Sequence, residues 1–529
     1  MKKYHLLLGG VVLVLAVILF WPRAKEDGGG AGGKVEEPAL PWFKGNTHTH
    51  TLWSDGNDFP DMVVDWYKKQ EYDFLALSDH NILSKGEKWM KISAIEGRKK
   101  VKGASVVEKY RERFGDEWVE TRGEGGNEEI RLKTLDELRP RFEEEGRFLL
   151  VEAEEITDSF KRHQVHINAL NLEEVIPPQK GTSVVETMRN NLRMVREQAE
   201  RLGKPIVAHL NHPNFHYSFT AEQLAEVVEE RFFEVYNGHP GINHLGDETR
   251  PGDEQLWDMA NAIRLGKLQA APLYGVATDD SHTYHGGNVS PGRGWIMVQA
   301  ERLDANLLME AMERGEFYSS SGVTLKEVSF RNDILELEIA GEAGVTYTTQ
   351  FVGTRKGEGA VAGEEFVVSR ELQPVYRLRG DELYVRAVVT SSKDHPNPSF
   401  ADQKEQAWTQ PVGWREAVGP VPQPEPALIG KWVIKESGGV KSVDDTAVFE
   451  FMADGKYAES TSLARHDGTW KLAGGDLTTS IRTDPDSADT SDTKYAIKSL
   501  EGNRLVLLAV ELEIEMVLER QVVDKSEDE

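Results

Sequence analysis

Short apolar runs alternate with amphipathic segments between residues 41 and 315, and polar side chains follow most of the apolar runs. A continuous apolar run bounded by turn residues predicts a strand that is buried on both faces, as in a parallel sheet. We expect such strands at 73–77, 148–153, 164–170, 205–208, 232–236 and 273–277. The alternation of these runs with helical patterns predicts an α/β domain.

Helix signals lie between the predicted strands. Pro60 suits the first turn of a helix over 61–70, and Ser183-x-x-Glu186 begins a helix that runs to Gly203. Further helices are expected after Thr220-x-x-Gln223, near 254–265, and from Asp304 to Gly315. A charged segment over 84–146 interrupts the alternation and predicts helices near 104–114 and 134–145. It is either a lid or a solvated helical excursion.

The pattern changes after residue 325. Short alternating segments at 328–330, 334–339, 347–352, 375–378 and 383–390 predict an antiparallel sandwich. A proline-rich linker follows at 420–426. The region 428–521 begins with I-G-K-W and contains D-G and G-N turns, and in this it resembles lipocalin-like small β-barrels. Such a barrel either has a filled core or holds a small apolar ligand.

The chain begins with Met-Lys-Lys and an apolar run from Leu6 to Trp21. This pattern is typical of a signal peptide or a short membrane anchor, and the glycine-rich stretch after it of a flexible tether. No small-x-small cleavage site follows, which favours an uncleaved anchor. We therefore expect an extracytoplasmic protein, periplasmic or at the cell surface, that is membrane-anchored or secreted.

Composition limits the chemistry. The 529 residues contain no cysteine, which excludes disulfides, thiolate metal sites and a cysteine nucleophile. A formal charge of −27 argues against nucleic acid as a partner, because like charges repel. Any bound metal must be held by His, Asp and Glu.

Such side chains gather at the ends of the predicted strands. The segment 46–56 reads N-T-H-T-H-T-L-W-S-D-G, and alternation places His48 and His50 on one face of a strand. Two imidazoles on one face can bind one divalent cation. Because the carboxyl ends of parallel strands meet at one edge, ligand-type residues at several ends predict a multinuclear metal site.

The ordered motifs are H-T-H with S-D-G, S-D-H-N, E-I-T, H-I-N, N-H-P-N and D-D-S-H. Together they resemble the motifs of the PHP (polymerase and histidinol phosphatase) metallohydrolase family over residues 41–323. The resemblance implies a distorted (β/α)7 barrel with two or three divalent metals (zinc, manganese or iron), and hydrolysis of phosphate esters.

The resemblance also implies the ligands. His48 and His50 would bind the first metal with Glu155 and Asp280, and Glu155 would bridge to a second metal. The second metal would also be held by His166 and by the histidine of N-H-P-N. That histidine is His212 by its place before proline, although His209 lies nearer the strand end. The third metal would be bound by Asp55, His80 and His282. Asp280 is preferred to Asp279 by its spacing, and Asp79, Asp279 and Glu154 are candidates for orienting the imidazoles.

Metals that share a water would activate it for attack on phosphorus, so no protein nucleophile is needed. Asp79 or the metal-linked His80 would relay the proton. A phosphate also needs cationic partners, for which Arg293 is the first candidate and Arg162 with His163 the next. His239 and His244 are candidates to line the pocket.

We therefore predict a small-molecule phosphate ester as substrate, with the membrane contacted through the N-terminal segment. Two alternatives stay open: hydrolysis of amides or other esters at the same site, and a metal-containing cell-surface binding module without turnover. The predicted organisation is an anchor or signal peptide (1–22), a linker (23–40), the PHP-type barrel (41–325), a sandwich-like domain (326–419), a proline-rich linker (420–427), the lipocalin-like barrel (428–521) and an acidic tail (522–529).

Overall fold

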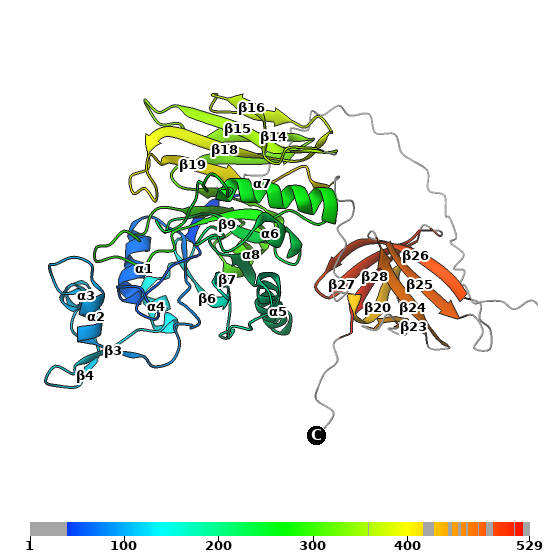
Figure 1. The fold of residues 1–529 in the computed structure, drawn as a ribbon. Helices are drawn as coiled ribbons and strands as arrows, with labels where there is room; N and C mark the ends of the chain where they lie inside the picture. The colour runs from blue at the N-terminus through cyan, green and yellow to red at the C-terminus, as the bar shows by residue number, and fades with distance from the viewer. Residues whose placement is uncertain are drawn as a thin grey trace, which may run out of the picture. The chain divides into compact units, whose positions relative to one another are not determined.

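The computed structural model describes residues 40–357, 359–415, 428–442, 447–452, 456–461, 464–473, 476–482, 490–510, 512 and 514–521 (Figure 1). The expected anchor, both linkers and the acidic tail lie wholly or almost wholly outside these residues. Within the described part of the chain, no helix is both long and apolar enough to span a bilayer.

The first domain is built on seven neighbouring strands of a larger sheet, in the order β10-β9-β8-β7-β6-β2-β1. Their bounds are β1 Trp42–Asn46, β2 Phe74–Leu77, β6 Leu149–Phe160, β7 His163–Leu170, β8 Val207–Leu210, β9 Phe232–Asn237 and β10 Tyr274–Thr278. Each of these strands contributes a side chain to one core cluster, through Phe43, Phe74, Val151, Leu170, Val207, Phe232 and Val276. The curved sheet therefore encloses a common apolar core.

A closed, regularly alternating (β/α)7 barrel is not confirmed. The strands β6 and β7 form a hairpin with no helix between them, and β7 runs antiparallel to both of its neighbours. The first and last strands share no ladder; they meet only beyond their ends, through a parallel bridge between Thr49 and Ser281. This bridge nevertheless brings the segment after β1 against the segment after β10.

The helices largely follow the signals read from the sequence. Their bounds are α1 Pro60–Lys69, α2 Ile92–Arg98, α3 Val106–Phe114, α4 Leu135–Phe142, α5 Val184–Leu202, α6 Ala221–Glu226, α7 Asp253–Ile263, α8 Ala305–Arg314 and a π-helical turn η1 Arg264–Leu268. Reciprocal capping boxes begin α4 at Thr134 and α6 at Thr220. Gly203 adopts the left-handed conformation that ends α5.

The inserted segment 84–146 has its own small sheet, β3-β5-β4 (Trp89–Lys91, Glu129–Arg131, Thr121–Arg122), together with α2, α3 and α4. Its buried Ile95, Tyr110 and Ile130 share a core cluster with Trp53 and Phe59, which follow β1. The insertion therefore packs against the chain that leads out of the His-x-His motif.

The sandwich-like region continues the first sheet. β11 (Trp295–Gln299) pairs with β1, and β12 (Phe317–Ser320) joins β11 to β19 (Lys404–Thr409), β18 (Glu382–Asp394), β15 (Tyr347–Arg355) and β16 (Glu364–Ser369). A second sheet of β13 (Leu325–Arg331), β14 (Ile334–Ile339) and β17 (Val375–Arg377) shares a core cluster with it. A single hydrogen-bonded sheet thus continues from the first domain into the second.

The C-terminal region is a closed β-barrel of eight strands. They are β20 Gly430–Ser437, β22 Val448–Phe451, β23 Lys456–Ser460, β24 Arg465–Ala473, β25 Asp476–Arg482, β26 Thr490–Glu501, β27 Arg504–Ala509 and β28 Ile514–Arg520, with β21 (Val440–Lys441) beside β20. Pairing of β20 with β28 closes the barrel. Trp432, Tyr457 and Leu518 are buried in its core, consistent with the lipocalin-like resemblance.

Candidate metal centre

His48 and His50 follow β1 directly and converge at one point. Their Nε2 atoms lie 3.1 Å apart, and both rings are fully buried. Backbone hydrogen bonds fix them against the chain after β10: Asp280 N donates to His48 O, and His50 N donates to Ser281 O, each at 3.0 Å. The two imidazoles therefore face one site, just beyond the strand on which they were expected.

Two buried carboxylates face this histidine pair. Asp280 Oδ1 lies 3.3 Å from His48 Nε2 and 3.2 Å from His50 Nε2. Glu155 contacts the same two nitrogens with its two oxygens: Oε1 lies 3.5 Å from His48 Nε2, and Oε2 lies 3.5 Å from His50 Nε2. This is a mixed nitrogen and oxygen donor set of the type that holds borderline divalent metals.

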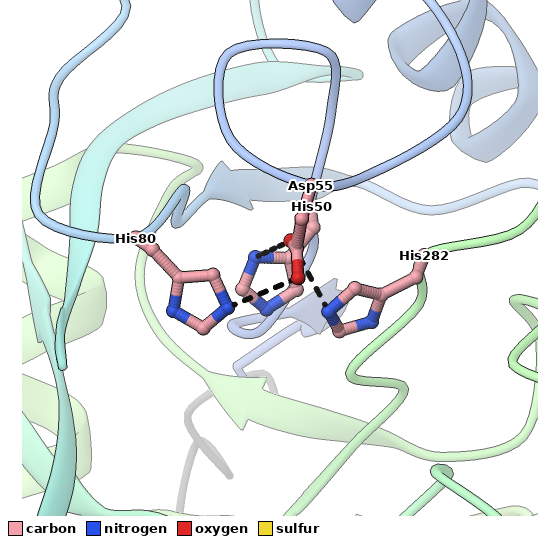
Figure 2. Close-up of side chains that lie close together, drawn as sticks. All are labelled: His50, Asp55, His80 and His282. Carbon is pink, nitrogen blue, oxygen red and sulfur yellow. Dashed lines mark ion pairs between the residues drawn. The ribbon is translucent and has the colours of Figure 1, made fainter. Parts of the chain in front are cut away.

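A second group lies toward solvent and consists of His50, Asp55, His80 and His282 (Figure 2). The half-exposed carboxylate of Asp55 lies 3.5 Å from His80 Nε2 and 3.4 Å from His282 Nε2. Gly56 allows this arrangement, because a Cβ there would come within 2.7 Å of the His50 backbone. The S-D-G turn can thus fold back over the His-x-His segment.

A third group surrounds the other side of Glu155. His166 Nδ1 lies 2.9 Å from Glu155 Oε1, and His80 Nδ1 lies 2.7 Å from Oε2. Glu155 and His166 are within the β6–β7 hairpin rather than at strand ends. The hairpin is longer than its neighbours, so these positions come level with the ends of β1, β2 and β10.

The two histidines of H-L-N-H lie at different distances from the centre. His212 Nε2 lies 3.4 Å from Glu155 Oε1, and its ring is 5.0 Å from that of His166. His209 is fully buried, its Nδ1 lies 3.9 Å from Glu234 Oε1, and neither of its nitrogens has a hydrogen-bond partner among the described residues. His212 is therefore the nearer to the second expected metal position, whereas His209 lies behind it.

Two members of the centre have left-handed backbones although neither is glycine: φ is 29° at His212 and 49° at Asp280. Such conformations cost about 1–3 kcal/mol each and concentrate at functional sites. Here the turn at Asp280 separates it from Asp279, so that Asp280 faces the histidines. Asp279 instead accepts hydrogen bonds from Tyr67 Oη and from the amides of residues 292–294.

Glu234, which lies within β9, was not predicted from the sequence. This buried carboxylate accepts hydrogen bonds from His48 Nδ1 (2.7 Å), Thr278 Oγ1 (2.8 Å), the His212 amide (2.7 Å) and Asn237 Nδ2 (2.8 Å). It fixes the ring of His48 through the nitrogen that faces away from the centre. A single carboxylate inside an otherwise apolar strand was the signal that could have revealed it.

Asn168 and Asn211 were also not identified. Asn211 Nδ2 donates to Glu155 Oε1 and to Asn168 Oδ1, each at 2.9 Å. Asn168 Nδ2 donates to Thr47 O and Ser78 Oγ. The two amides thus link Glu155 to the ends of β1 and β2.

Asp79 does not contact the imidazoles directly. Its carboxylate accepts hydrogen bonds from Thr51 N and Thr51 Oγ1, each at 2.8 Å, and from Ser54 Oγ at 2.5 Å. Ser54 Oγ lies 3.4 Å from His50 Nδ1. Glu154 points to the other face of β6, where it accepts a hydrogen bond from the Ile176 amide, and burial raises its pKa to about 8.

The expected phosphate-binding cations lie elsewhere. Arg293 donates through its guanidinium to Gly238 O, Asn397 O and Asn397 Oδ1, and it does not line the cavity described below. It follows the last motif in sequence, but the turn held by Asp279 directs its side chain toward the β18–β19 loop. Arg162 and His163 lie at the tip of the β6–β7 hairpin, and His163 Nδ1 contacts Ser218 O.

The centre lies at a cavity of about 500 Å³. Its described lining includes Asp55, His80, Glu155, His166, His212, Asp280 and His282, together with Arg98, Lys100, Phe215 and His239. His239 therefore lines the pocket as expected, whereas His244 pairs with Asp253 at 2.9 Å and is not among these residues.

Electrostatics keep the carboxylates ionised. Burial opposes charge on Glu155, but the imidazoles of His80, His166 and His48 outweigh it and hold its pKa well below the usual range. Asp280 has its pKa lowered well below its usual range in the same way, chiefly by His48 and His50. Burial, with His282 and His80 nearby, lowers the pKa of His50 to about 3. His50 is therefore neutral at physiological pH, with a lone pair free for a metal.

Solved structures that are similar to this chain include three that are described here, each with low sequence identity and a low TM-score. A two-domain protein from Bacteroides vulgatus ATCC 8482, containing a predicted PHP-like metal-dependent phosphoesterase, is 15% identical, with a TM-score of 0.33 over 73% of this chain and 100% of that chain. An amidohydrolase from Chromobacterium violaceum, solved with sulfate and no metal, is 15% identical, with a TM-score of 0.24 over 45% of this chain and 88% of that chain.

An uncharacterized protein from Bacteroides eggerthii DSM 20697 is 17% identical, with a TM-score of 0.16 over 18% of this chain and 99% of that chain. No family model and no curated relative matches the sequence.

Proposed function

We propose that this chain is a metal-dependent hydrolase of the PHP type that cleaves phosphate esters with metal-activated water. The observation that carries the proposal is the convergence of three overlapping His and acid groups on Glu155, His50 and His80 at one cavity. Structural histidines are usually satisfied singly by a neighbouring donor or acceptor. Imidazoles gathered around two shared buried carboxylates instead form a donor set for more than one cation.

The donor set fits divalent metals by its own chemistry. The Nε2 atoms of His48 and His50 face each other, and the buried Nδ1 atom of His212 has no hydrogen-bond partner among the described residues. A buried polar atom without a partner is costly, so an unpartnered imidazole nitrogen in this cluster supports a bound cation. His48, His50, Glu155 and Asp280 would hold one metal, and Glu155, His80, His166 and His212 would surround a second. Asp55 and His282 would complete a third site with His50 or His80.

Metals bound there would lower the pKa of a shared water and neutralise charge on the ester oxygens. The chain's own residues supply the rest. Glu234 orients His48, Asn211 orients Glu155, and Asp79 holds the loop that carries Ser54 and Asp55. His80 Nδ1 lies between Glu155 Oε2 and Thr157 Oγ1, so a proton at this nitrogen can be held or passed at the edge of the cavity.

Phosphate release tests the proposal. The purified protein is supplied with zinc, manganese or iron and assayed on a phosphate monoester, a phosphate diester, a carboxylic ester and an amide. His50→Ala should abolish turnover, whereas His466→Ala, on the exposed surface of the C-terminal barrel, should not change it. Turnover of only the amide or carboxylic ester would replace the phosphoesterase proposal. Metal binding without turnover of any substrate would favour a binding module.

We further propose that the N-terminal segment anchors the protein outside the cytoplasm. The support is the apolar run between Leu6 and Trp21 with Lys2 and Lys3 before it. Protease accessibility of the catalytic body on intact cells or spheroplasts tests this orientation.

A further inference from the structure

A short part of the insertion lies between two loops of the candidate centre. We name residues 98–101 the strap. Arg98, at the end of α2, donates through Nη1 to Ser54 O at 2.9 Å and to Gly56 O at 2.8 Å, the carbonyls that flank Asp55. The Lys100 amide donates to His285 O at 3.0 Å. The strap therefore joins the loop that carries Asp55 to the loop that follows His282.

Packing reinforces this placement. Gly286 has a φ of 74°, and a Cβ at this position would come within 2.3 Å of Val101 Cγ1. The strap thus lies directly against the backbone of the 283–287 loop. Its position is fixed from both sides, which restricts the side chains that it presents to the cavity.

The strap supplies positive charge to the cavity. The side chains of Arg98 and Lys100 line it together with Asp55, His80 and His282. Among the described residues, no carboxylate forms an ion pair with either cation, whereas the neighbouring Lys99 pairs with Glu96 at 3.0 Å. In a chain with 89 acidic and 62 basic residues, two cations without acidic partners at one cavity point to an anionic ligand.

The geometry of Arg98 suits an oxyanion. Its hydrogen bonds to the described residues use only Nη1, so Nε and Nη2 keep their donors for a ligand. A guanidinium already held in place by two carbonyls loses little freedom when it binds phosphate. Lys100 is exposed and can follow the ligand as a mobile point charge.

Another part of the lining is aromatic. Phe215 lies 5.3 Å from the ring of His212 and 5.9 Å from that of His239. These rings come from the loops after β8 and β9 rather than from the insertion. They offer flat surface to an organic group attached to the anion.

We propose that the strap is the substrate-selecting wall of this site: Arg98 and Lys100 bind the dianionic phosphate of a phosphomonoester, and Phe215 and His239 contact its organic group. This inference rests on the proposed phosphoesterase function. Two cations interact more strongly with a dianion than with the single charge of a diester. The insertion thus contributes selectivity, while the ligands for the metals come from the sheet.

Matched lysine variants test whether the strap binds the phosphate of the substrate. Lys100→Ala is compared with Lys102→Ala, an exposed lysine two residues further along that does not line the cavity. Loss of one charge-assisted contact should raise KM for a monoester about tenfold in Lys100→Ala and leave kcat within about twofold. KM for the diester of the same alcohol should change less than about threefold, and Lys100→Glu should raise monoester KM further. Equal monoester KM in Lys100→Ala and Lys102→Ala would overturn the inference.

Binding of inorganic phosphate, measured by calorimetry on the metal-loaded full chain, separates the two proposals. We expect weaker binding in Lys100→Ala than in Lys102→Ala. If the protein hydrolyses no phosphate ester but shows this difference, the proposed function fails and the anion-binding wall stands. If it hydrolyses esters and phosphate affinity is the same in both variants, the function stands and the wall is refuted.

Discussion

Replacing Glu234 by glutamine removes a negative charge from the support of the centre without changing its volume. The wild-type carboxylate accepts four hydrogen bonds, including those from His48 Nδ1 and the His212 amide, and is fully buried. Although burial opposes its charge, His48, His209 and His212 lower the pKa of Glu234 to about 2, so it is ionised at neutral pH. The amide keeps one acceptor oxygen and turns an NH2 group toward the remaining donors.

The expected loss follows from these contacts. Hydrogen bonds to a charged group contribute about 1.5–3 kcal/mol each, so two donors left facing an amide NH2 cost about 3–6 kcal/mol. Part of this cost appears in stability and part in metal affinity, because His48 loses the partner that fixes its ring. Removal of such partners typically weakens metal binding by about 10–100-fold.

Competition against a fluorescent chelator measures the metal affinity, and thermal unfolding of the metal-free protein measures the stability. Glu230→Gln is the matched control for metal affinity, since Glu230 is also buried, lies just before β9, and bonds only to the backbone amides of residues 231 and 232 among the described contacts. Wild-type metal affinity in a folded Glu234→Gln variant would refute the assignment of Glu234 as the residue that positions His48.

Three further outcomes are expected. Burial raises the pKa of Glu230 to about 7, so the native state holds a proton that the unfolded chain releases above its ordinary pKa of about 4.5, and stability falls as the pH rises from about 4.5 to 7. Glu230→Gln should therefore raise Tm at pH 8 but not at pH 4. An equal change of Tm at both pH values would contradict this. Arg386→Met should lower the free energy of unfolding by about 3–5 kcal/mol, because it leaves Asp258 buried without the guanidinium whose Nη2 lies 2.7 Å from its Oδ2. Denaturant titration measures this loss, and the double variant Arg386→Met with Asp258→Leu should recover much of it. Removing metal with a chelator should lower Tm, and a site that was in free metal at a hundred times its Kd should lose about 2.7 kcal/mol of stabilisation. Calorimetry before and after zinc or manganese is added back measures the change, and an unchanged Tm would contradict metal binding to the folded protein.

Local signals were sufficient for most of the helices. The capping boxes at Thr134 and Thr220 begin helices where the sequence predicted helices, because a cap depends on residues within one turn. Strands were located less accurately: β6 extends to Phe160, well beyond the apolar run that predicted it. Its distal half is polar because it pairs with β7 in a hairpin, and the sequence pattern of a buried parallel strand does not apply there.

The candidate centre shows the same division. The expected metal donors between His48 and His282 lie in short local motifs, so the motif resemblance could name each donor from the sequence. Motif spacing preferred Asp280 to Asp279, and the structure supplies the physical reason, which is a left-handed turn at Asp280 and packing against the segment after β1. Arg293 was expected near phosphate because it follows the last motif, but side-chain direction after a turn is not encoded in spacing.

The sequence by itself determined the donor chemistry: no cysteine, histidines paired with carboxylates, and a fixed order of motifs. Only the tertiary structure decided which groups support and surround those donors. Glu234 contacts His48 across 186 residues, and Arg98 reaches the Asp55 loop across 42 and 44. Periodicity and capping report interactions within a few residues, whereas such contacts arise from the curvature of the sheet and from where an insertion packs.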